Sequence, residues 1–334
     1  MEQKSLNEKI DFVVAWVDGN DPVWRNEMFK YVPEEMRKRE DSAGDDRYVD
    51  NGLFRFWFRS IEKFAPWVNK IFFITYGHLP EWLDTSNPKL VIVNHKDYMP
   101  QEYLPTFNFV PLALNLHRIK GLSEHFVLFN DDMYLTSPCD KKVFFKKGLP
   151  CDMAVQDGLL ADRFDMYNYM LFNAMCIINK NYRKKDIIRK NKSKWFNLKY
   201  GKNFVKNLLL SKISLFTGFY STHMPQSYLK SMFEKVWEDN PKELDQSSRN
   251  KFRYYNDITE EIVQYYQFVE GKFSPVNRNK MGRYLTMTNG RLPKIIISGK
   301  YKYICINSNA DGEVLGRAKK AFETILPDKS SFEL

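Results

Sequence analysis

The stretch FVLFNDDMYL (residues 126–135) carries the pattern that decides the fold. An apolar run with the composition of a buried strand ends at Asn130, Asp131 and Asp132, and a second apolar run follows at once. Adjacent carboxylates repel each other, so their place at the exit of a strand needs a physical reason. One reason is a turn capped by Asx side chains, and the other is a ligand site at the end of the strand.

Similar apolar runs recur along the first half of the chain and alternate with helical patterns. Such alternation is typical of an α/β fold with a mostly parallel sheet and helices on both faces. The expected strands are 9–17, 70–77, 89–95 and 125–132, and the expected helices are 51–65 and 109–119, with a short helical piece at 79–84.

In a sheet of this kind, ligands bind at the carboxyl ends of the strands. The first expected strand ends in DGND (18–21) and the fourth in NDD (130–132). We therefore expect both acid-rich exits to lie together on the ligand-binding edge.

The second half is less regular and has no internal repeat or low-complexity linker. We expect one domain with an N-terminal part (1–179), a basic helical insertion (180–215) and a C-terminal part (216–334). The expected strands here are 152–158, 173–180 and 300–309, and the expected helices are 228–238 and 257–271.

The net charge of +10 is concentrated in one segment. Residues 180–212 contain twelve Lys and Arg against one acid, Asp186, so this segment alone carries +11. Aromatic residues such as Trp195 and Tyr200 are interleaved with the basic ones. The pattern predicts a docking surface for an anionic partner, which is a membrane leaflet, a nucleic acid or a polyanionic acceptor, or else a solvated helix face.

Several protein classes lose support from what the sequence lacks. It has no apolar run of about 18 residues and no signal-peptide pattern at its start, which predicts a cytoplasmic protein. The four cysteines stand singly, as expected of reduced thiols. Walker A, Gly-x-Gly-x-x-Gly, Gly-x-Ser-x-Gly and His-Glu-x-x-His motifs are all missing, which argues against the common kinases, dehydrogenases, serine hydrolases and zincins.

Candidate residues for chemistry have alternative structural explanations. Asp131 and Asp132 suit Mg²⁺ or Mn²⁺ beside a diphosphate, because these cations prefer oxygen ligands. His223, in YSTHMPQSY just before an expected helix, is either a base or a structural histidine. Two arginine pairs have helical spacing and could clamp phosphate or pair with nearby acids: Arg55 with Arg59, and Arg249 with Arg253.

Four regions, in this order, resemble the Stealth family of hexose-1-phosphate transferases, which make bacterial capsules and cell-surface polysaccharides. The family includes the catalytic subunit of animal N-acetylglucosamine-1-phosphotransferase. The matching segments are IDFVVAWVDGNDPVW (10–24); 47–83 with LPTFN (104–108) and 117–135; HMPQS (223–227) with KFRYYNDI (251–258); and YICINSN (303–309) with FETILPDKSSFEL (322–334).

The resemblance implies a GT-A-like nucleotide-sugar fold, in which residues 1–179 bind the nucleotide sugar. It implies a UDP-hexose donor, Mg²⁺ or Mn²⁺, and a hydroxyl acceptor on a polysaccharide or a lipid-linked oligosaccharide. The sugar would leave with its phosphate, and UMP would be released. An ordinary glycosyltransferase that releases UDP is the alternative. Nucleic-acid binding is disfavoured, because acidic strand exits repel a polyanion. The basic segment would hold the enzyme peripherally at the inner face of the membrane.

The resemblance also implies roles for individual residues. Asp132, with Asn307 and Asn309, would hold the metal, and His223 would be the base, with Asp131 as the second candidate. Arg253 and Arg249 would stabilise the reacting phosphoryl group. The expected substrate-binding residues are Asp18, Gly19, Asp21, Arg55, Arg59, Asn108, His117 and Arg118.

This sequence departs from the family pattern at two places. Gln226 stands where many members have a second histidine, and Asn307, Ser308 and Asn309 stand where an acidic residue is common. Any metal ligand from the second place would be an amide or hydroxyl oxygen, which binds more weakly than a carboxylate.

Overall fold

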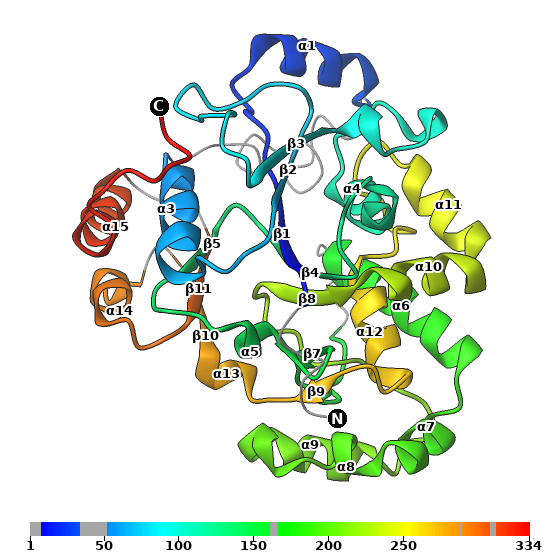
Figure 1. Ribbon diagram of the computed structural model, residues 1–334. Helices are drawn as coiled ribbons and strands as arrows, with labels where there is room; N and C mark the ends of the chain where they lie inside the picture. The colour runs from blue at the N-terminus through cyan, green and yellow to red at the C-terminus, as the bar shows by residue number, and fades with distance from the viewer. Residues whose placement is uncertain (1–7, 34–51, 161–165, 287–288, 308–311) are drawn as a thin grey trace.

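A five-stranded sheet forms the centre of the protein (Figure 1). The computed structural model describes residues 8–33, 52–160, 166–286, 289–307 and 312–334. The strand order is β3-β2-β1-β4-β8; the first four are parallel and β8 is antiparallel to β4. The strands are β1 (Ile10–Ala15), β2 (Ile71–Thr75), β3 (Leu90–Asn94), β4 (His125–Phe129) and β8 (Gln226–Leu229).

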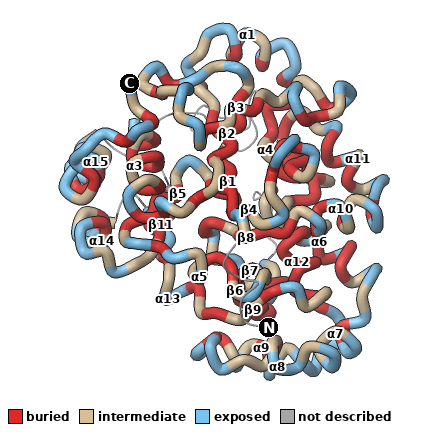
Figure 2. The backbone as a smooth tube through the Cα atoms, in the orientation of Figure 1, coloured by how far each residue is buried: buried red, intermediate tan, exposed pale blue. Residues whose placement is uncertain are grey.

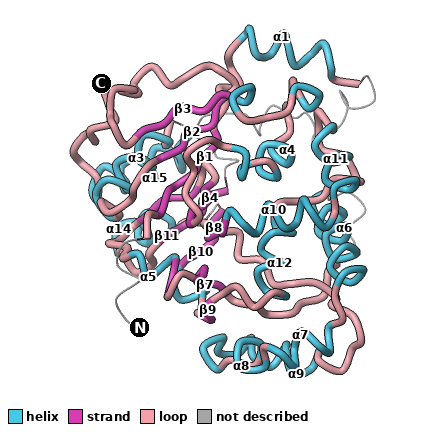
Figure 3. Tube along the Cα trace, turned by 45° about the vertical axis from the view of Figure 1, so that its right-hand side comes forward, coloured by secondary structure: helices cyan, strands magenta, loops and turns pink. Residues whose placement is uncertain are grey.

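Helices cover both faces of this sheet, as Figures 1 and 3 show. On one side, α3 (Phe54–Phe64) turns Phe54, Trp57, Phe58 and Ile61 into the core at the spacing of one helix face. α15 (Gly312–Ile325) and α14 (Leu292–Ser298) lie outside α3. The predicted α/β fold with a mostly parallel sheet is therefore confirmed.

The remaining larger helices lie on the other face of the sheet (Figure 1). The buried residues are concentrated in the strands between the two helix layers (Figure 2). These helices are α4 (Phe109–Leu114), α6 (Met166–Asn181), α10 (Lys230–Asp239), α11 (Pro241–Arg249) and α12 (Glu261–Val269), while α1 (Pro22–Tyr31) follows the exit of β1. The expected helices at 51–65, 228–238 and 257–271 are thus confirmed.

Two small sheets lie beside the central one. One has the order β10-β11-β5, from β10 (Gly282–Thr286), β11 (Tyr303–Asn307) and β5 (Met133–Leu135). The other joins β6 (Phe145–Lys146), β7 (Leu149–Asp152) and β9 (Ser274–Pro275), flanked by α5 (Lys141–Phe144) and α13 (Arg278–Met281). Because β5 directly follows the NDD turn, its pairing with β11 brings the end of β11 beside Asp132, whose carbonyl accepts the Ile306 N–H at 2.9 Å.

Four details of the expected structure are wrong. The expected strand 152–158 shares only Asp152 with β7, and Gln156 forms no more than an isolated bridge to Phe219. Residues 173–180 belong to α6, where Met170, Ala174 and Ile178 bury one face; short apolar runs do not distinguish a buried strand from a helix. Residues 79–84 form turns and a bridge between Leu83 and Glu333, not a helix. The expected helix at 109–119 stops at Leu114 and resumes as a short 3-10 turn.

The basic segment is helical, as expected. It contains α7 (Lys184–Lys190), α8 (Lys192–Trp195), the 3-10 helix η6 (Leu198–Asn203) and α9 (Phe204–Leu210). These helices form an outer layer away from the central sheet (Figures 1 and 3). No described helix has both the length and the apolar composition that a membrane span requires.

Candidate active site

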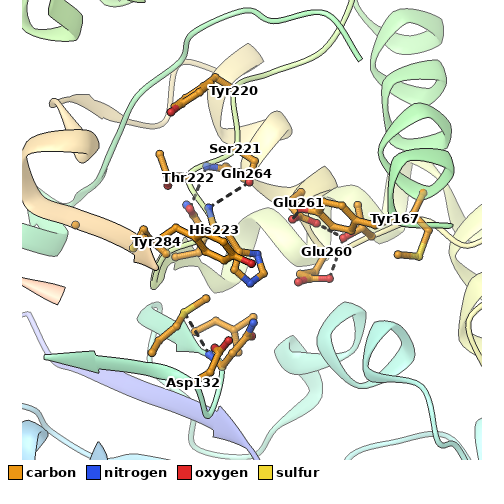
Figure 4. A pocket seen from close by; sticks show the side chains of 18 of the residues that line it. Asp132, Tyr167, Tyr220, Ser221, Thr222, His223, Glu260, Glu261, Gln264 and Tyr284 are labelled. Carbon is orange, nitrogen blue, oxygen red and sulfur yellow. Dashed lines mark hydrogen bonds between the residues drawn. The ribbon is translucent and has the colours of Figure 1, made fainter. Parts of the chain in front are cut away.

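A cavity of about 1320 Å³ opens beyond the carboxyl end of β4. Its walls come from segments that are far apart in sequence: the NDD turn, the loop before β8, the start of α12, β10 and the basic segment. Figure 4 shows His223 at its centre, with Asp132 on one side and Glu260 and Glu261 on another. Of the site residues predicted from the sequence, Asp132, His223 and Arg253 line this cavity.

Asp132 lines this cavity and has one carboxylate oxygen without a hydrogen-bond partner in the described chain. Its Oδ2 accepts a hydrogen bond from the Cys305 thiol, with 3.3 Å between sulfur and oxygen. Its Oδ1 is buried and has no hydrogen-bond partner among the described residues. Burial raises the pKa of the Asp132 carboxyl, and the neighbouring His223 and Cys305 oppose that rise. A buried carboxylate oxygen without a partner is costly, so this position is suited to a cation or a substrate proton.

His223 is held in an unusual backbone conformation. Its φ is 47°, in the left-handed region that residues other than Gly, Asn and Asp rarely adopt. Its N–H donates to Ser221 Oγ at 3.3 Å, and its ring contacts Tyr284 edge-on with 5.5 Å between centroids. A ring nitrogen, a carboxylate oxygen of Asp132 and the sulfur of Cys305 lie within 4.8 Å of one another. Strained residues concentrate at functional sites, so the conformation supports a role in chemistry.

A buried polar network fixes the loop that carries His223. Arg278 donates to the carbonyls of Met224 and Pro225 at 3.3 and 2.8 Å, and to the side chain of Gln226 at 2.6 Å. Asp152 accepts from Arg278 at 3.3 Å and from Gln226 at 2.7 Å. Gln226, which replaces the second histidine of the family pattern, therefore positions the His223 loop.

Arg253 and an acidic pair form the wall beside α12. Arg253 lines the cavity and makes no hydrogen bond or ion pair with any other described residue. The Thr259 hydroxyl lies within hydrogen-bonding distance of both glutamates, 3.0 Å from Glu260 and closer to Glu261, and Glu261 also accepts from Tyr167. Burial, reinforced by Glu261, raises the pKa of Glu260 to about 8. This wall therefore offers a guanidinium without a hydrogen-bond partner in the described chain, the Glu260 carboxyl, whose raised pKa favours the protonated form that can donate at neutral pH, and a second carboxyl on Glu261.

Basic residues lie along another part of the cavity wall. Lys202 and Lys206 come from the basic segment, and Arg283 comes from β10. Lys206 pairs with Asp157 at 2.6 Å, whereas Lys202 and Arg283 are exposed. Their positive charge would favour a phosphorylated ligand in the cavity.

The residues present fit a divalent cation at Asp132. The unpaired Oδ1 supplies a carboxylate oxygen, and the end of β11 is hydrogen-bonded to the backbone carbonyl of the same residue. Burial, together with the neighbouring Asp132, raises the pKa of the Cys305 thiol, so Cys305 acts as a donor that orients Asp132. The predicted ligand Asn309 lies outside the described residues, and for Asn307 the structure describes only the backbone, at the end of β11.

The predicted residues at the exit of β1 are engaged locally. Asp21 caps α1 by accepting from the N–H groups of Val23 and Trp24, at 2.8 and 3.3 Å, and pairs with His78 at 2.8 Å. Burial by itself would raise the pKa of Asp21, but these hydrogen bonds outweigh it, and the pKa is lowered. Asp18 accepts from the Asn20 N–H at 2.8 Å, and the Gly19 carbonyl accepts from an arginine of α1. None of the three lines the cavity at Asp132.

The remaining predicted arginines also lie outside the cavity lining. Arg59 forms a two-pronged salt bridge with Glu333, at 2.7 Å on each side, and Arg55 lies over the ring of Trp82. Arg249 pairs with Asp245 one helical turn away, at 2.8 Å. Their role in substrate binding stays a prediction.

Three further predicted residues pack near the start and end of α4. Asn108 caps α4 through Val110 and donates to Asp257 at 3.0 Å. His117 is held between aromatic rings, and burial lowers its pKa to about 4. Arg118 stacks on Trp237. Asp131, the alternative base, is exposed and does not line the cavity.

The sequence analysis missed several residues of the cavity. Glu260, Glu261 and Tyr284 carried no recognisable motif, although the two glutamates precede an apolar helical run that is otherwise buried. Cys305 was interpreted only as a reduced thiol, and the pairing of β11 with β5 is what places it against Asp132.

Comparison with known proteins places this chain in a family. Models of two Stealth conserved regions match: region 1 at residues 8–35 and region 2 at residues 47–151. A capsular polysaccharide phosphotransferase, WcwK, of Streptococcus pneumoniae is 41% identical over 97% of this chain and 98% of its own length. A receptor polysaccharide phosphotransferase, WefC, of Streptococcus gordonii is 39% identical over 98% and 99%. An exopolysaccharide phosphotransferase, cps2G, of Lactiplantibacillus plantarum is 37% identical over 97% and 96%.

Among solved structures, the galactosyltransferase LgtC, in complex with donor and acceptor sugar analogues, overlaps with a TM-score of 0.42 at 8% identity, covering 96% of this chain and 98% of its own. The sequence relatives are far closer than this structure and extend over nearly the whole chain. The chain therefore belongs to the Stealth family and is an enzyme of the phosphotransferase class.

Proposed function

We propose that the protein transfers hexose-1-phosphate from a UDP-hexose to a hydroxyl group of a polysaccharide or a lipid-linked oligosaccharide, and releases UMP. The observation that carries the proposal is the meeting of Asp132, His223 and Arg253 in one cavity. The names of the relatives support it, since they are polysaccharide phosphotransferases.

The reaction is a single in-line displacement at the β-phosphorus. The acceptor oxygen forms a new bond to that phosphorus, and the bond from phosphorus to the bridging oxygen breaks, so that UMP leaves with the bonding pair. The imidazole of His223 takes the proton of the acceptor hydroxyl. The bond between C1 of the hexose and its oxygen is never broken, so the anomeric configuration of the donor is retained in the phosphodiester.

The charges of the cavity act on the phosphoryl group. Arg253 has no other partner among the described residues, so its guanidinium is available to the phosphoryl oxygens, where charge develops. Asp132 Oδ1, with the end of β11, would hold Mg²⁺ or Mn²⁺, which when bound neutralises the charge of the diphosphate. Tyr284 and the Arg278 network keep the His223 ring facing Asp132.

The identity of the released nucleotide tests the proposal. Purified protein is incubated with Mg²⁺ or Mn²⁺, a panel of UDP-hexoses and an acceptor extract, and the nucleotides are separated by chromatography. UMP that forms only with acceptor and metal is the expected result. Release of UDP would instead show that the bond between C1 and oxygen is cleaved, as in ordinary glycosyl transfer. That result would overturn the proposal, although Asp132 would keep its proposed role at the diphosphate.

A further inference from the structure

The outer surface of the basic segment is apolar as well as charged. Seventeen large hydrophobic side chains are exposed in the described residues, and six of them fall within the 18 positions 198–215. We call these six the apolar patch: Leu198, Val205, Leu208, Leu209, Ile213 and Leu215. The other eleven are scattered from residue 23 to residue 334, so exposure of this kind is concentrated on one short segment.

The helix α9 shows that this exposure is built into the fold. Val205, Leu208 and Leu209 have the i, i+3, i+4 spacing of one helix face, and they are 51%, 45% and 68% exposed. The inward position is held by Asn207, which donates to the carbonyls of Ala154 and Trp195 at 2.9 and 2.6 Å. A surface helix usually turns its apolar face inward, whereas α9 anchors a polar residue and turns its apolar face outward.

A buried lysine fixes the far end of the same surface. The amine of Lys184 donates to the carbonyls of Leu210 and Leu215 at 2.7 and 3.0 Å. Burial lowers the pKa of Lys184 to about 8. The loop that carries Ile213 and Leu215 is therefore tied to α7, and the apolar patch is held in place without a partner.

The segment that carries the apolar patch is also rich in positive charge. The side chains of seven basic residues of the segment form no hydrogen bond or ion pair with any other part of the described chain: Arg183, Lys185, Lys190, Lys192, Lys199, Lys202 and Lys212. The only acid between residues 180 and 215 is Asp186, which pairs with Arg189. Apolar side chains among unpaired cations match a surface that is apolar within and anionic at its boundary.

We propose that the apolar patch and its lysines dock the protein on an anionic lipid membrane. The leucines of α9 enter the boundary between headgroups and acyl chains, and Lys199, Lys202 and Lys212 contact anionic headgroups. The same segment supplies Lys202 and Lys206 to the cavity wall, so docking brings the candidate active site close to the lipid surface. This inference does not depend on which nucleotide the enzyme releases.

Binding to vesicles tests the proposal without an activity measurement. The full chain is sedimented with vesicles of phosphatidylcholine mixed with phosphatidylglycerol, and with vesicles of phosphatidylcholine alone. Binding to the anionic vesicles, weakened by added salt, is expected. The double variant Leu208→Ser/Leu209→Ser should bind at least about tenfold more weakly. Lys199→Glu and Lys212→Glu should each weaken binding about fivefold or more.

The matched control is Ile297→Ser, which alters a side chain of α14 that is 49% exposed and lies outside the basic segment. Its binding should equal that of the wild type. Thermal melting shows that each variant is folded, as expected for exposed positions. Equal binding by wild type and the double variant, or no binding to anionic vesicles, would overturn the proposal. Two other results would also overturn the proposal, because each identifies a different occupant of the patch. One is a wild-type dimer that becomes a monomer in the double variant, and the other is binding to RNA in place of vesicles.

Discussion

The exits of β1 and β4 lie side by side on neighbouring parallel strands, and both carry two acids within four residues. At the exit of β1, Asp21 accepts two backbone hydrogen bonds and pairs with His78. At the exit of β4, one oxygen of Asp132 accepts from the Cys305 thiol, and the other is buried without a partner in the described chain. The pKa of Asp21 is lowered, and that of Asp132 is raised by its burial.

This difference separates a carboxylate that stabilises the fold from one that is prepared for a ligand. A partnered carboxylate is stable in the free protein, whereas a buried oxygen without a donor is stabilised only when something binds. The same distinction applies to arginines, since Arg59 is paired with Glu333 and Arg253 has no partner among the described residues. Each pair compares residues of the same type, and only the surroundings differ.

Exchanging each acid for its amide tests the comparison most strongly. Asp132→Asn should lower kcat by about a thousandfold or more, equal to about 4 kcal/mol, because the amide cannot hold a cation or neutralise charge as a carboxylate does. Its melting temperature should not fall, since the substitution removes a buried charge. Steady-state kinetics and thermal melting measure both effects.

Asp21→Asn is the matched control for this experiment. Asparagine caps a helix about as well as aspartate, so stability should change little, and kcat should fall less than about tenfold. A larger loss of kcat in Asp21→Asn than in Asp132→Asn would reverse the comparison and favour the exit of β1 as the reacting site.

The His223 loop offers the next test. His223→Asn should lower kcat by about a hundred- to a thousandfold, because the general base is lost. Asparagine tolerates the left-handed backbone, so the variant should melt at the same temperature as the wild type or slightly above it. His223→Ala controls for backbone strain and should lose the same activity with a lower melting temperature. Undiminished turnover in either variant would remove His223 from the role of base.

The sequence was sufficient for the parts of the fold that are set by local pattern. The buried runs of β1, β2, β3 and β4 are nearly continuous in apolar residues, and each strand lies where the pattern predicted it. The segment 173–180 was misassigned, because eight residues of a buried helix have the same composition as a buried strand.

The candidate site could be predicted only in part. His223 and Asp132 were named from the family resemblance, and the cavity brings them within 4.8 Å. Glu260 and Cys305 were not named, because their importance comes from tertiary contacts: one is defined by burial beside Glu261, and the other by the pairing of β11 with β5. No local pattern encodes which carboxylate lacks a partner, since that depends on elements from the whole chain.

The two arginines provide a smaller test. Arg253→Gln should lower kcat roughly a hundredfold while leaving the melting temperature nearly unchanged, because the guanidinium has no partner in the described fold. Arg59→Gln should do the opposite: it leaves Glu333 buried without a cation, at a cost of about 3 kcal/mol in the free energy of unfolding, with near-normal kcat. Kinetics and denaturant unfolding distinguish the two outcomes. A hundredfold loss in Arg59→Gln at full stability would instead support the predicted role of Arg59 in substrate binding.

The smallest effect concerns Glu260, whose carboxyl resembles that of Asp132 in one respect: burial raises its pKa. Its pKa in the folded protein, about 8, exceeds the usual value of 4.5. Between these values the folded state binds more protons than the unfolded state, so stability falls as pH rises from about 4.5 to 8. Glu260→Gln removes this penalty, and its melting temperature should exceed that of the wild type by a few degrees at about pH 8.5 and by little at about pH 5.

Glu243→Gln is the matched control, because an ion pair with Lys180 lowers the pKa of Glu243. The stability that the ionised Glu243 contributes to the folded protein is fully present above pH 4.5, the usual pKa of a glutamate, and is lost only below that pH. The control should therefore melt slightly below the wild type by an equal amount at both pH values. If Glu260→Gln shows the same flat difference, the carboxyl of Glu260 is ionised in the folded protein. The contrast between a carboxyl whose pKa is raised by burial and one whose pKa is lowered by its partners then does not extend beyond Asp132.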